Sequence, residues 1–253
     1  MRAKPTRPEV GTASGALVQL LRGGRDVVRV GHRGAAALAP ENSLAAIEAA
    51  ALHGVDAVEL DVLPRGDGAL VLAHGPELPP HAPLVGEGLE LAASLGLAVQ
   101  LDVKVRGMEV GVVEALRRAG LLERSFVSSF SLRILGDFAA AAPALPRSFT
   151  YPEDRLGLTG RRLVRPAVAP GLAALRALLP RRLPRWLRAV DASAATLNWA
   201  VVTPQAVAVC HGLGAAIYVW TVNDPALVRT LVESDIDGII TDDPRLLAPE
   251  SSR

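Results

Sequence analysis

The sequence lacks the features that mark secreted, membrane-embedded or nucleic-acid-binding proteins. Its 253 residues include one cysteine, Cys210, which excludes an internal disulfide and gives no sign of secretion. The 27 basic and 26 acidic residues nearly cancel, so the overall charge does not predict nucleic acid as a partner. There is no uncharged apolar run of about 20 residues and no apolar core of a signal peptide near the N-terminus. We therefore expect a cytoplasmic protein.

Hydrophobic residues, by contrast, make up 50 % of the chain, enough for a sizeable core. A chain of this length commonly forms a single α/β barrel. The first residues and the last few are polar and lack periodicity. We expect a flexible segment over residues 1–22, one barrel domain over residues 23–248 and a tail over residues 249–253.

Short apolar runs alternate with amphipathic helical patterns along the chain. About eight such units predict parallel strands with helices between them, and eight units favour a closed (β/α)8 TIM barrel. A doubly wound open sheet is the alternative, but the sequence has no G-x-G-x-x-G turn after the first strand. The expected strands cover residues 27–34, 57–63, 97–104, 125–130, 147–151, 195–199, 216–222 and 237–242. The expected helices cover residues 42–54, 85–96, 107–120, 131–143, 203–214 and 224–234.

One further strand pattern, residues 70–75, follows the second strand too closely for a helix to fit between them. The connection RGDG instead predicts an antiparallel β-hairpin. If the turn centres on Gly66 and Asp67, the numbers of paired residues sum to 133. This register predicts that Glu59 lies opposite His74.

Charged and polar residues follow the ends of several predicted strands, where a barrel collects them at one rim. They are His32, Arg33, Glu59, Asp61, Asp102, Lys104 and Trp220. Three carboxylates suit a hard divalent cation, Mg²⁺ or Ca²⁺, and the lack of a Cys/His cluster argues against zinc. The two cationic side chains suit a phosphate, and two histidines supply a base and an acid near neutral pH.

These residues carry a resemblance to a known family. The segments GHRG, PENS, ELDV, LAHG, LDVK, SSF, VWTVND and DGIITDDP occur in the order typical of glycerophosphodiester phosphodiesterases. The resemblance spans roughly residues 28–247. It implies a barrel of the phospholipase-C-like phosphodiesterase type. It also implies hydrolysis of small glycerophosphodiesters to sn-glycerol 3-phosphate and an alcohol.

The resemblance also implies roles for single residues. His32 and His74 match the general base and acid, and one divalent cation is bound. Glu59 and Asp61 match metal ligands, and Asp102 stands where the family usually has a third, glutamate ligand. The remaining matches are Arg33 and Lys104 at phosphate-contacting positions, Trp220 at a pocket aromatic, and Glu41 and Asn42 at a supporting turn.

Three departures from the family pattern leave other functions open. Gly75 replaces an aspartate after His74, Asp102 replaces glutamate, and only GPELPPHAPL remains where relatives carry an inserted subdomain. A more open pocket would suit a lysophospholipase-D-like hydrolase at a membrane. Alternatively, the chain is a catalytically degenerate barrel that binds a phosphodiester without cleaving it.

Residues 155–190 contain nine arginines and no Asp, Glu or Lys. The arginines are residues 155, 161, 162, 165, 176, 181, 182, 185 and 188. Such a segment is most often a solvated face, but it also suits steering of an anionic substrate or peripheral contact with an anionic inner membrane face. The sequence does not determine the alcohol group of the substrate, the preferred ion or the oligomeric state.

Overall fold

A computed structural model describes residues 26–75, 77–153 and 165–247. The segment 1–22 and the tail 249–253, for which flexibility is predicted, lie outside the described residues. Eight parallel strands form a closed barrel in the order β1-β2-β4-β5-β6-β7-β8-β9, and the pairing of β1 with both β2 and β9 completes the ring. The strands are β1 (Val28–His32), β2 (Ala57–Pro64), β4 (Ala98–Val103), β5 (Ser125–Ser129), β6 (Arg147–Tyr151), β7 (Ala194–Asn198), β8 (Ala216–Trp220) and β9 (Gly238–Thr241).

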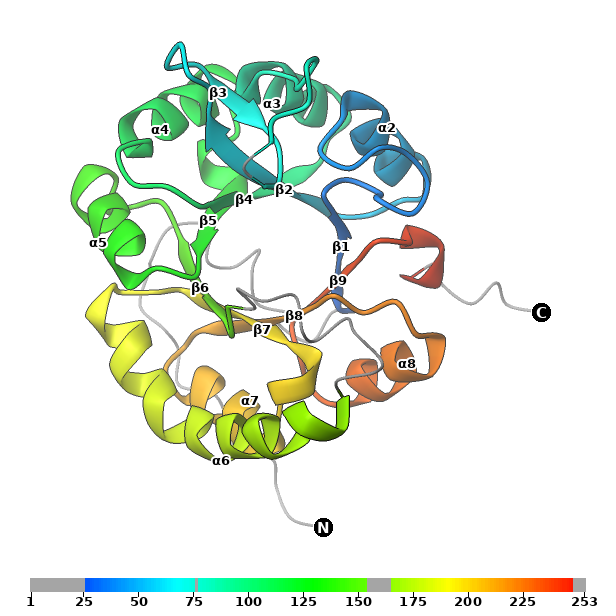
Figure 1. Ribbon diagram of the computed structural model, residues 1–253, viewed down its shortest axis with the longest axis vertical. Coiled ribbons are helices and arrows are strands. Elements are labelled where there is room, and N and C mark those ends of the chain that lie inside the picture. Colours follow the sequence, from blue (N-terminus) through cyan, green and yellow to red (C-terminus); the bar gives the residue numbers. More distant parts are fainter. Residues whose placement is uncertain (1–25, 76, 154–164, 248–253) are drawn as a thin grey trace.

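Helices surround this barrel, as the view down its axis shows (Figure 1). The α-helices are α2 (Leu44–Leu52), α3 (Val85–Ser94), α4 (Glu109–Arg118), α5 (Leu132–Ala141), α6 (Arg165–Ala189), α7 (Pro204–Gly212) and α8 (Pro225–Glu233). Short 3₁₀ turns are η1 (Leu122–Arg124), η3 (Trp199–Val201) and η4 (Pro244–Leu247). The predicted (β/α)8 barrel is confirmed, and the open-sheet alternative is wrong because β1 pairs with β2.

Two apolar layers hold the barrel together. Inside it, small and aromatic side chains pack at the centre, among them Val30, Phe126 and Tyr218. Outside it, the apolar faces of the helices pack on the strands, and the buried residues include Ile47 of α2 and Phe138 of α5. The side chains of successive strand residues alternate between these two layers, which is why polar residues near the strand ends face one another across the barrel mouth.

The predicted hairpin is present, but its predicted register is wrong. Strand β3 (Leu70–Leu72) pairs antiparallel with β2, and Val62 lies opposite Leu72, so paired numbers sum to 134. The turn does centre on Gly66 and Asp67, with the Gly68 amide donating to the Arg65 carbonyl. Gly68, with a φ of +87°, is an extra bulged residue that shifts the register by one. His74 therefore lies beyond the paired strand and not opposite Glu59.

The longest element, α6, was not among the predicted helices. It is 25 residues long and curves around the outside of the barrel past α7 (Figure 1). Pro180 and Pro184 lie inside it, and each removes a backbone donor, which accounts for a bend in the helix. Leu179, Leu183 and Leu187 are buried beneath it and anchor it to the barrel.

Candidate active site

The site begins at the tight turn that connects β1 to α2. A Cβ atom on Gly31 would lie 2.0 Å from the Gly34 carbonyl oxygen, and one on Gly34 would lie 2.6 Å from the Ala46 backbone. Both positions therefore require glycine. Between them, Arg33 adopts a φ of +50°, a sparsely populated backbone region for a non-glycine residue. This turn directs the side chains of His32 and Arg33 into the mouth of the barrel.

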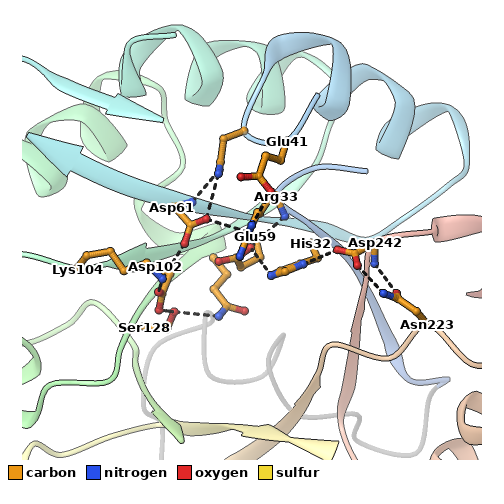
Figure 2. A network of polar contacts seen from close by, with 12 residues as sticks. His32, Arg33, Glu41, Glu59, Asp61, Asp102, Lys104, Ser128, Asn223 and Asp242 are labelled. Carbon is orange, nitrogen blue, oxygen red and sulfur yellow. Dashed lines mark hydrogen bonds and ion pairs between the residues drawn. The ribbon is translucent and has the colours of Figure 1, made fainter. Parts of the chain in front are cut away.

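His32 is held from the far end of the chain. Its Nδ1 lies 2.6 Å from an oxygen of Asp242, which directly follows β9. The amide of Asn223 donates to the other Asp242 oxygen, and the Asn223 carbonyl accepts from the backbone N–H of Asp242. On the other side of the ring, Nε2 of His32 lies 3.9 Å from Glu59 (Figure 2). The imidazole is thus fixed between two carboxylates.

Three buried carboxylates lie together beside this histidine. Glu59 and Asp61 project from β2 and Asp102 from β4, and each offers an oxygen within 4.8 Å of the others. They are 4 %, 1 % and 3 % exposed, so water screens their charges little. Such a group of oxygen ligands matches the preference of Mg²⁺ and Ca²⁺. Among the described residues, no other His/Cys/Asp/Glu group has this geometry.

Two cationic side chains compensate part of this negative charge. The Lys104 ammonium donates to Asp61 at 2.8 Å and also to Asp102. The Arg33 guanidinium lies 3.2 Å from Asp61 and also pairs with Glu41. Arg33 and Lys104, the residues at the predicted phosphate positions, therefore contact carboxylates of the cluster (Figure 2).

The PENS segment contacts the carboxylate cluster from the turn before α2. Asn42, with a φ of +56°, is 2 % exposed. Its side-chain amide donates to the Asp61 carboxylate, and its carbonyl accepts from the Asp61 backbone N–H. Glu41 holds Arg33, while Ser43 caps α2 by accepting from the Ala46 N–H. This turn thus fixes the position of Asp61 from outside the strand that carries it.

The electrostatics of the cluster are uneven. Burial, together with the nearby charge of Asp61, raises the pKa of Glu59 to about 7. Burial acts in the same direction on Asp61, but Lys104 and Arg33 outweigh it and hold the pKa of Asp61 below its usual value. The ionised form of Glu59 is therefore poorly compensated, and a further cation bound beside it would favour that form.

The pKa values of the two histidines shift in opposite directions. Burial alone lowers the pKa of His32, but the hydrogen bond with Asp242 and the charge of Glu59 outweigh it, so the net pKa is raised. Partial burial lowers the pKa of His74, and the charges of Arg33 and Lys104 add to this effect. Groups whose environments separate their pKa values in this way suit different roles in acid–base chemistry.

His74 lies in the same cavity but is held far less firmly. Its side chain is exposed and forms no hydrogen bond with any of the described residues. Gly75 after it has a φ of +107° and open space around its Cβ position. An aspartate would be strained in this backbone conformation, so the local path of the chain favours glycine at position 75. Glu77, the next acidic residue after His74, is exposed and forms no hydrogen bond with it in the described part of the chain.

All the predicted catalytic, metal and phosphate residues line one cavity of about 660 Å³. Apolar side chains form much of the remaining wall, among them Leu63, Val105, Phe130 and Trp220. Trp220 packs edge-on against Phe130 with ring centroids 5.8 Å apart, and its indole N–H donates to the Thr196 carbonyl. The structure thus places Trp220 in the wall, and the two supporting residues, Glu41 and Asn42, behind it.

The sequence analysis missed four residues that hold the site in place. Asp242 and Asn223 fix His32, as described above. Ser128 donates to Asp102 at 2.7 Å, and Gln100 donates to Ser128 at 2.9 Å. Asn223 and Asp242 could have been identified from the sequence, because Asn223 lies in the segment VWTVND and Asp242 lies in DGIITDDP. Ser128 lies in SSF, whereas nothing in the sequence marks Gln100 apart from its position before Asp102.

Comparison with known proteins agrees with this geometry. The sequence profile of the glycerophosphoryl diester phosphodiesterase family matches residues 32–87 and 80–246. The chain is 29 % identical, over 91 % of its length and 92 % of the relative's, to a probable glycerophosphodiester phosphodiesterase 2 of Mycobacterium tuberculosis. It is 25 % identical to a glycerophosphodiester phosphodiesterase of Caldanaerobacter subterraneus, over 86 % of its length and 95 % of the relative's.

Solved structures share the fold. A putative glycerophosphoryl diester phosphodiesterase from Silicibacter pomeroyi superposes with a TM-score of 0.74 at 24 % identity, covering 91 % of this chain and 95 % of that one. A phosphodiesterase from Oleispira antarctica, in complex with the product sn-glycerol-3-phosphate, superposes with a TM-score of 0.68 at 20 % identity, covering 88 % and 96 %. With the family profile matched over most of its length, this chain belongs to the glycerophosphoryl diester phosphodiesterase family and is a phosphoric diester hydrolase.

Proposed function

We propose that the protein hydrolyses small glycerophosphodiesters to sn-glycerol 3-phosphate and an alcohol, with a divalent cation and with His32 and His74 as the acid–base pair. One observation carries the proposal: three buried carboxylates, two cations and both histidines line a single cavity. The product complex of the Oleispira relative supports a substrate of this size.

The residues present fit a divalent cation. Lys104 pairs with Asp61 and Asp102, and Arg33 pairs with Asp61, whereas the ion pair of Glu59 among the described residues is with His32, at 3.9 Å. We infer that Glu59, Asp61 and Asp102 hold Mg²⁺ or Ca²⁺. When bound, such an ion supplies positive charge for a phosphate oxygen and lowers the pKa of a hydroxyl beside it.

The side chains of the chain itself have distinct roles in this proposal. Arg33 and Lys104 bind the phosphate oxygens and stabilise the charge that develops on them. Of the two histidines, one removes the proton of the glycerol hydroxyl that attacks phosphorus, and the other protonates the alkoxide that leaves as the P–O bond to the alcohol breaks. Water then opens the resulting cyclic phosphate to give sn-glycerol 3-phosphate. Asp242 keeps the Nδ1–H of His32 occupied, which leaves Nε2 for proton transfer in the cavity.

The test is release of glycerol 3-phosphate from glycerophosphocholine by purified protein. We expect turnover with Mg²⁺ or Ca²⁺ and loss of turnover in EDTA that is restored by adding the ion. Glu59→Gln should abolish activity, whereas the exposed Glu114→Gln on α4 serves as the matched control. Binding of the ion without any turnover would instead identify a degenerate, binding-only barrel.

A second candidate function is hydrolysis of lysophospholipids by the same chemistry. Only residues 75–84 separate His74 from α3, and the cavity wall is rich in apolar side chains. A wall of this kind suits an acyl chain next to the glycerol group. Turnover of lysophosphatidylcholine relative to glycerophosphocholine separates the two candidates: a ratio above one favours the lipid substrate.

A further inference from the structure

The exposed side of α6 carries a stripe of arginines. Leu178, Arg181, Arg185 and Arg188 follow one another at spacings of three or four residues, which places them on one face of a helix. All are exposed, and none of the three arginines forms a hydrogen bond or ion pair within the described part of the chain. Some exposed arginines elsewhere in the described residues are paired, as Arg117 and Arg118 are with Glu114.

The charge of the chain is concentrated in this region. Residues 155–190 carry nine positive charges, whereas the formal net charge of the whole chain is +1. The rest of the protein therefore carries eight net negative charges. Five of these arginines lie on the part of α6 whose side chains the structure describes, and their positive potential favours an anionic partner there.

The arginine stripe is presented rigidly. On the opposite side of α6, Leu179, Leu183 and Leu187 are buried against the barrel, within the same cluster as Val201 of η3 and Val207 of α7. Trp186 packs on Tyr151 at the end of β6, with ring centroids 5.1 Å apart. Helix α6, which runs along the outside of the barrel (Figure 1), is thus anchored on its inner side, and the outer stripe remains available to a partner.

A groove lies beside this stripe. It has a volume of about 580 Å³ and lies between α6 and the start of α7. Arg176 and Arg181 line it from α6, and Thr203 and Gln205 line it from the other side. Two guanidinium groups and two polar side chains match the hydrogen-bonding needs of a phosphate group.

The inner side of α6 packs next to the cavity. Thr150 and Glu153 line the cavity, and Tyr151 between them contacts Trp186 of α6. Among the described residues, no helix is long and apolar enough to cross a membrane, so any contact with a bilayer through this part is peripheral.

We propose that the outer face of α6, defined by Leu178, Arg181, Arg185 and Arg188, together with Arg176 in the adjoining groove, binds the surface of an anionic phospholipid bilayer. The arginines contact lipid phosphates, one of which enters the groove beside α7. Leu178, 37 % exposed between them, provides an apolar contact, which favours a bilayer over a nucleic acid. The binding does not depend on catalysis, so it is tested separately from the proposed hydrolysis.

The experiment is sedimentation of the full chain with vesicles of phosphatidylcholine, with and without phosphatidylglycerol. We expect binding only to the anionic vesicles and loss of binding at high salt. The triple variant Arg181→Gln, Arg185→Gln, Arg188→Gln should bind about a hundredfold more weakly, at roughly fivefold for each arginine near the surface. Its thermal unfolding should match that of the unaltered chain, because all three side chains are exposed.

The matched control neutralises three exposed arginines of α4 and α5: Arg117→Gln, Arg118→Gln and Arg133→Gln. It makes the same change in net charge and should keep the binding. Equal loss in both triples would overturn the proposal, because net charge alone would then explain the binding. Tighter binding to duplex DNA than to the vesicles, or displacement from them by an equal concentration of inorganic phosphate, would also overturn it.

Discussion

Nδ1 of His32 lies 2.6 Å from Oδ1 of Asp242, although 210 residues separate them in the sequence. A carboxylate only accepts hydrogen bonds, so this contact places a proton on Nδ1 of the neutral ring. The other nitrogen, Nε2, is then directed toward Glu59 and the cavity. The residue after the last strand of the barrel thereby determines which nitrogen of the first strand's histidine faces the cavity.

Asp242→Asn should lower the pKa of His32, because burial remains while the hydrogen-bonded carboxylate is lost. An NMR titration of the ring protons measures the shift. The raised folded-state pKa of His32 contributes stability below the unfolded value of 6.5, and this contribution is lost as pH rises through the folded pKa. The free energy of unfolding that Asp242→Asn loses, measured by urea denaturation, should therefore be larger near pH 5.5 than near pH 8.5. An equal cost at both values would contradict this account.

His32→Ala and His74→Ala should each reduce the turnover of glycerophosphocholine by at least about a hundredfold, the usual scale for an acid or base. The structure distinguishes their effects on stability. His32 is tied to Asp242, whereas His74 is exposed and unbonded, so only His32→Ala should also lower the free energy of unfolding. His81→Ala, exposed and outside the cavity, is the control. Near-normal turnover in either variant would remove that histidine from the mechanism.

Metal affinity should depend on pH through Glu59. Burial and the charge of Asp61 raise the pKa of this carboxyl to about 7, so below that pH an ion must displace a proton to bind. Affinity for Mg²⁺ or Ca²⁺ should then fall about tenfold for each pH unit below about 7 and level off above it. Calorimetric titration in two buffers with different ionisation enthalpies measures the proton released. A flat affinity between about pH 6 and pH 8 would show that Glu59 is not the titrating group.

Arg147→Met should destabilise the fold by about 3 kcal/mol without touching the active site. Arg147, buried at the start of β6, donates to five backbone carbonyls. They belong to Ala142, Pro143, Leu145, Val190 and Asp191. A lysine lacks the planar guanidinium group that reaches all five carbonyls, so Arg147→Lys should retain only part of the stability that Arg147→Met loses. Arg133→Met on exposed α5 should change stability by less than about 0.5 kcal/mol.

The fold and the main groups of the site could be predicted because they leave local patterns. Strand residues such as Glu59 and Asp61 alternate with buried Val58, Leu60 and Val62, and the topology brings them to the barrel mouth. Asp242 lies in a visible motif, but its contact with His32 depends on barrel closure. No local pattern encodes which side chains meet across the first and last strands.

Two errors have different physical causes. The predicted hairpin register was wrong because Gly68 forms a bulge. A single extra residue shifts every predicted residue pair beyond it by one position. Helix α6 was missed because Pro180 and Pro184 read as breaks in a helix. Buried contacts of Leu179, Leu183 and Leu187 outweigh the local penalty, and such tertiary compensation is invisible in a single sequence.

The pairing of β1 with β9 also has a consequence for the synthesis of this protein. A ribosome makes the GHRG turn near the beginning of the chain and the TDDP segment close to the end. A nascent chain that lacks β9 has His32 without its orienting carboxylate and a barrel with an open edge. Premature termination before Asp242 would therefore yield a product that keeps all its predicted metal ligands but lacks both the carboxylate that fixes His32 and the strand end that follows it.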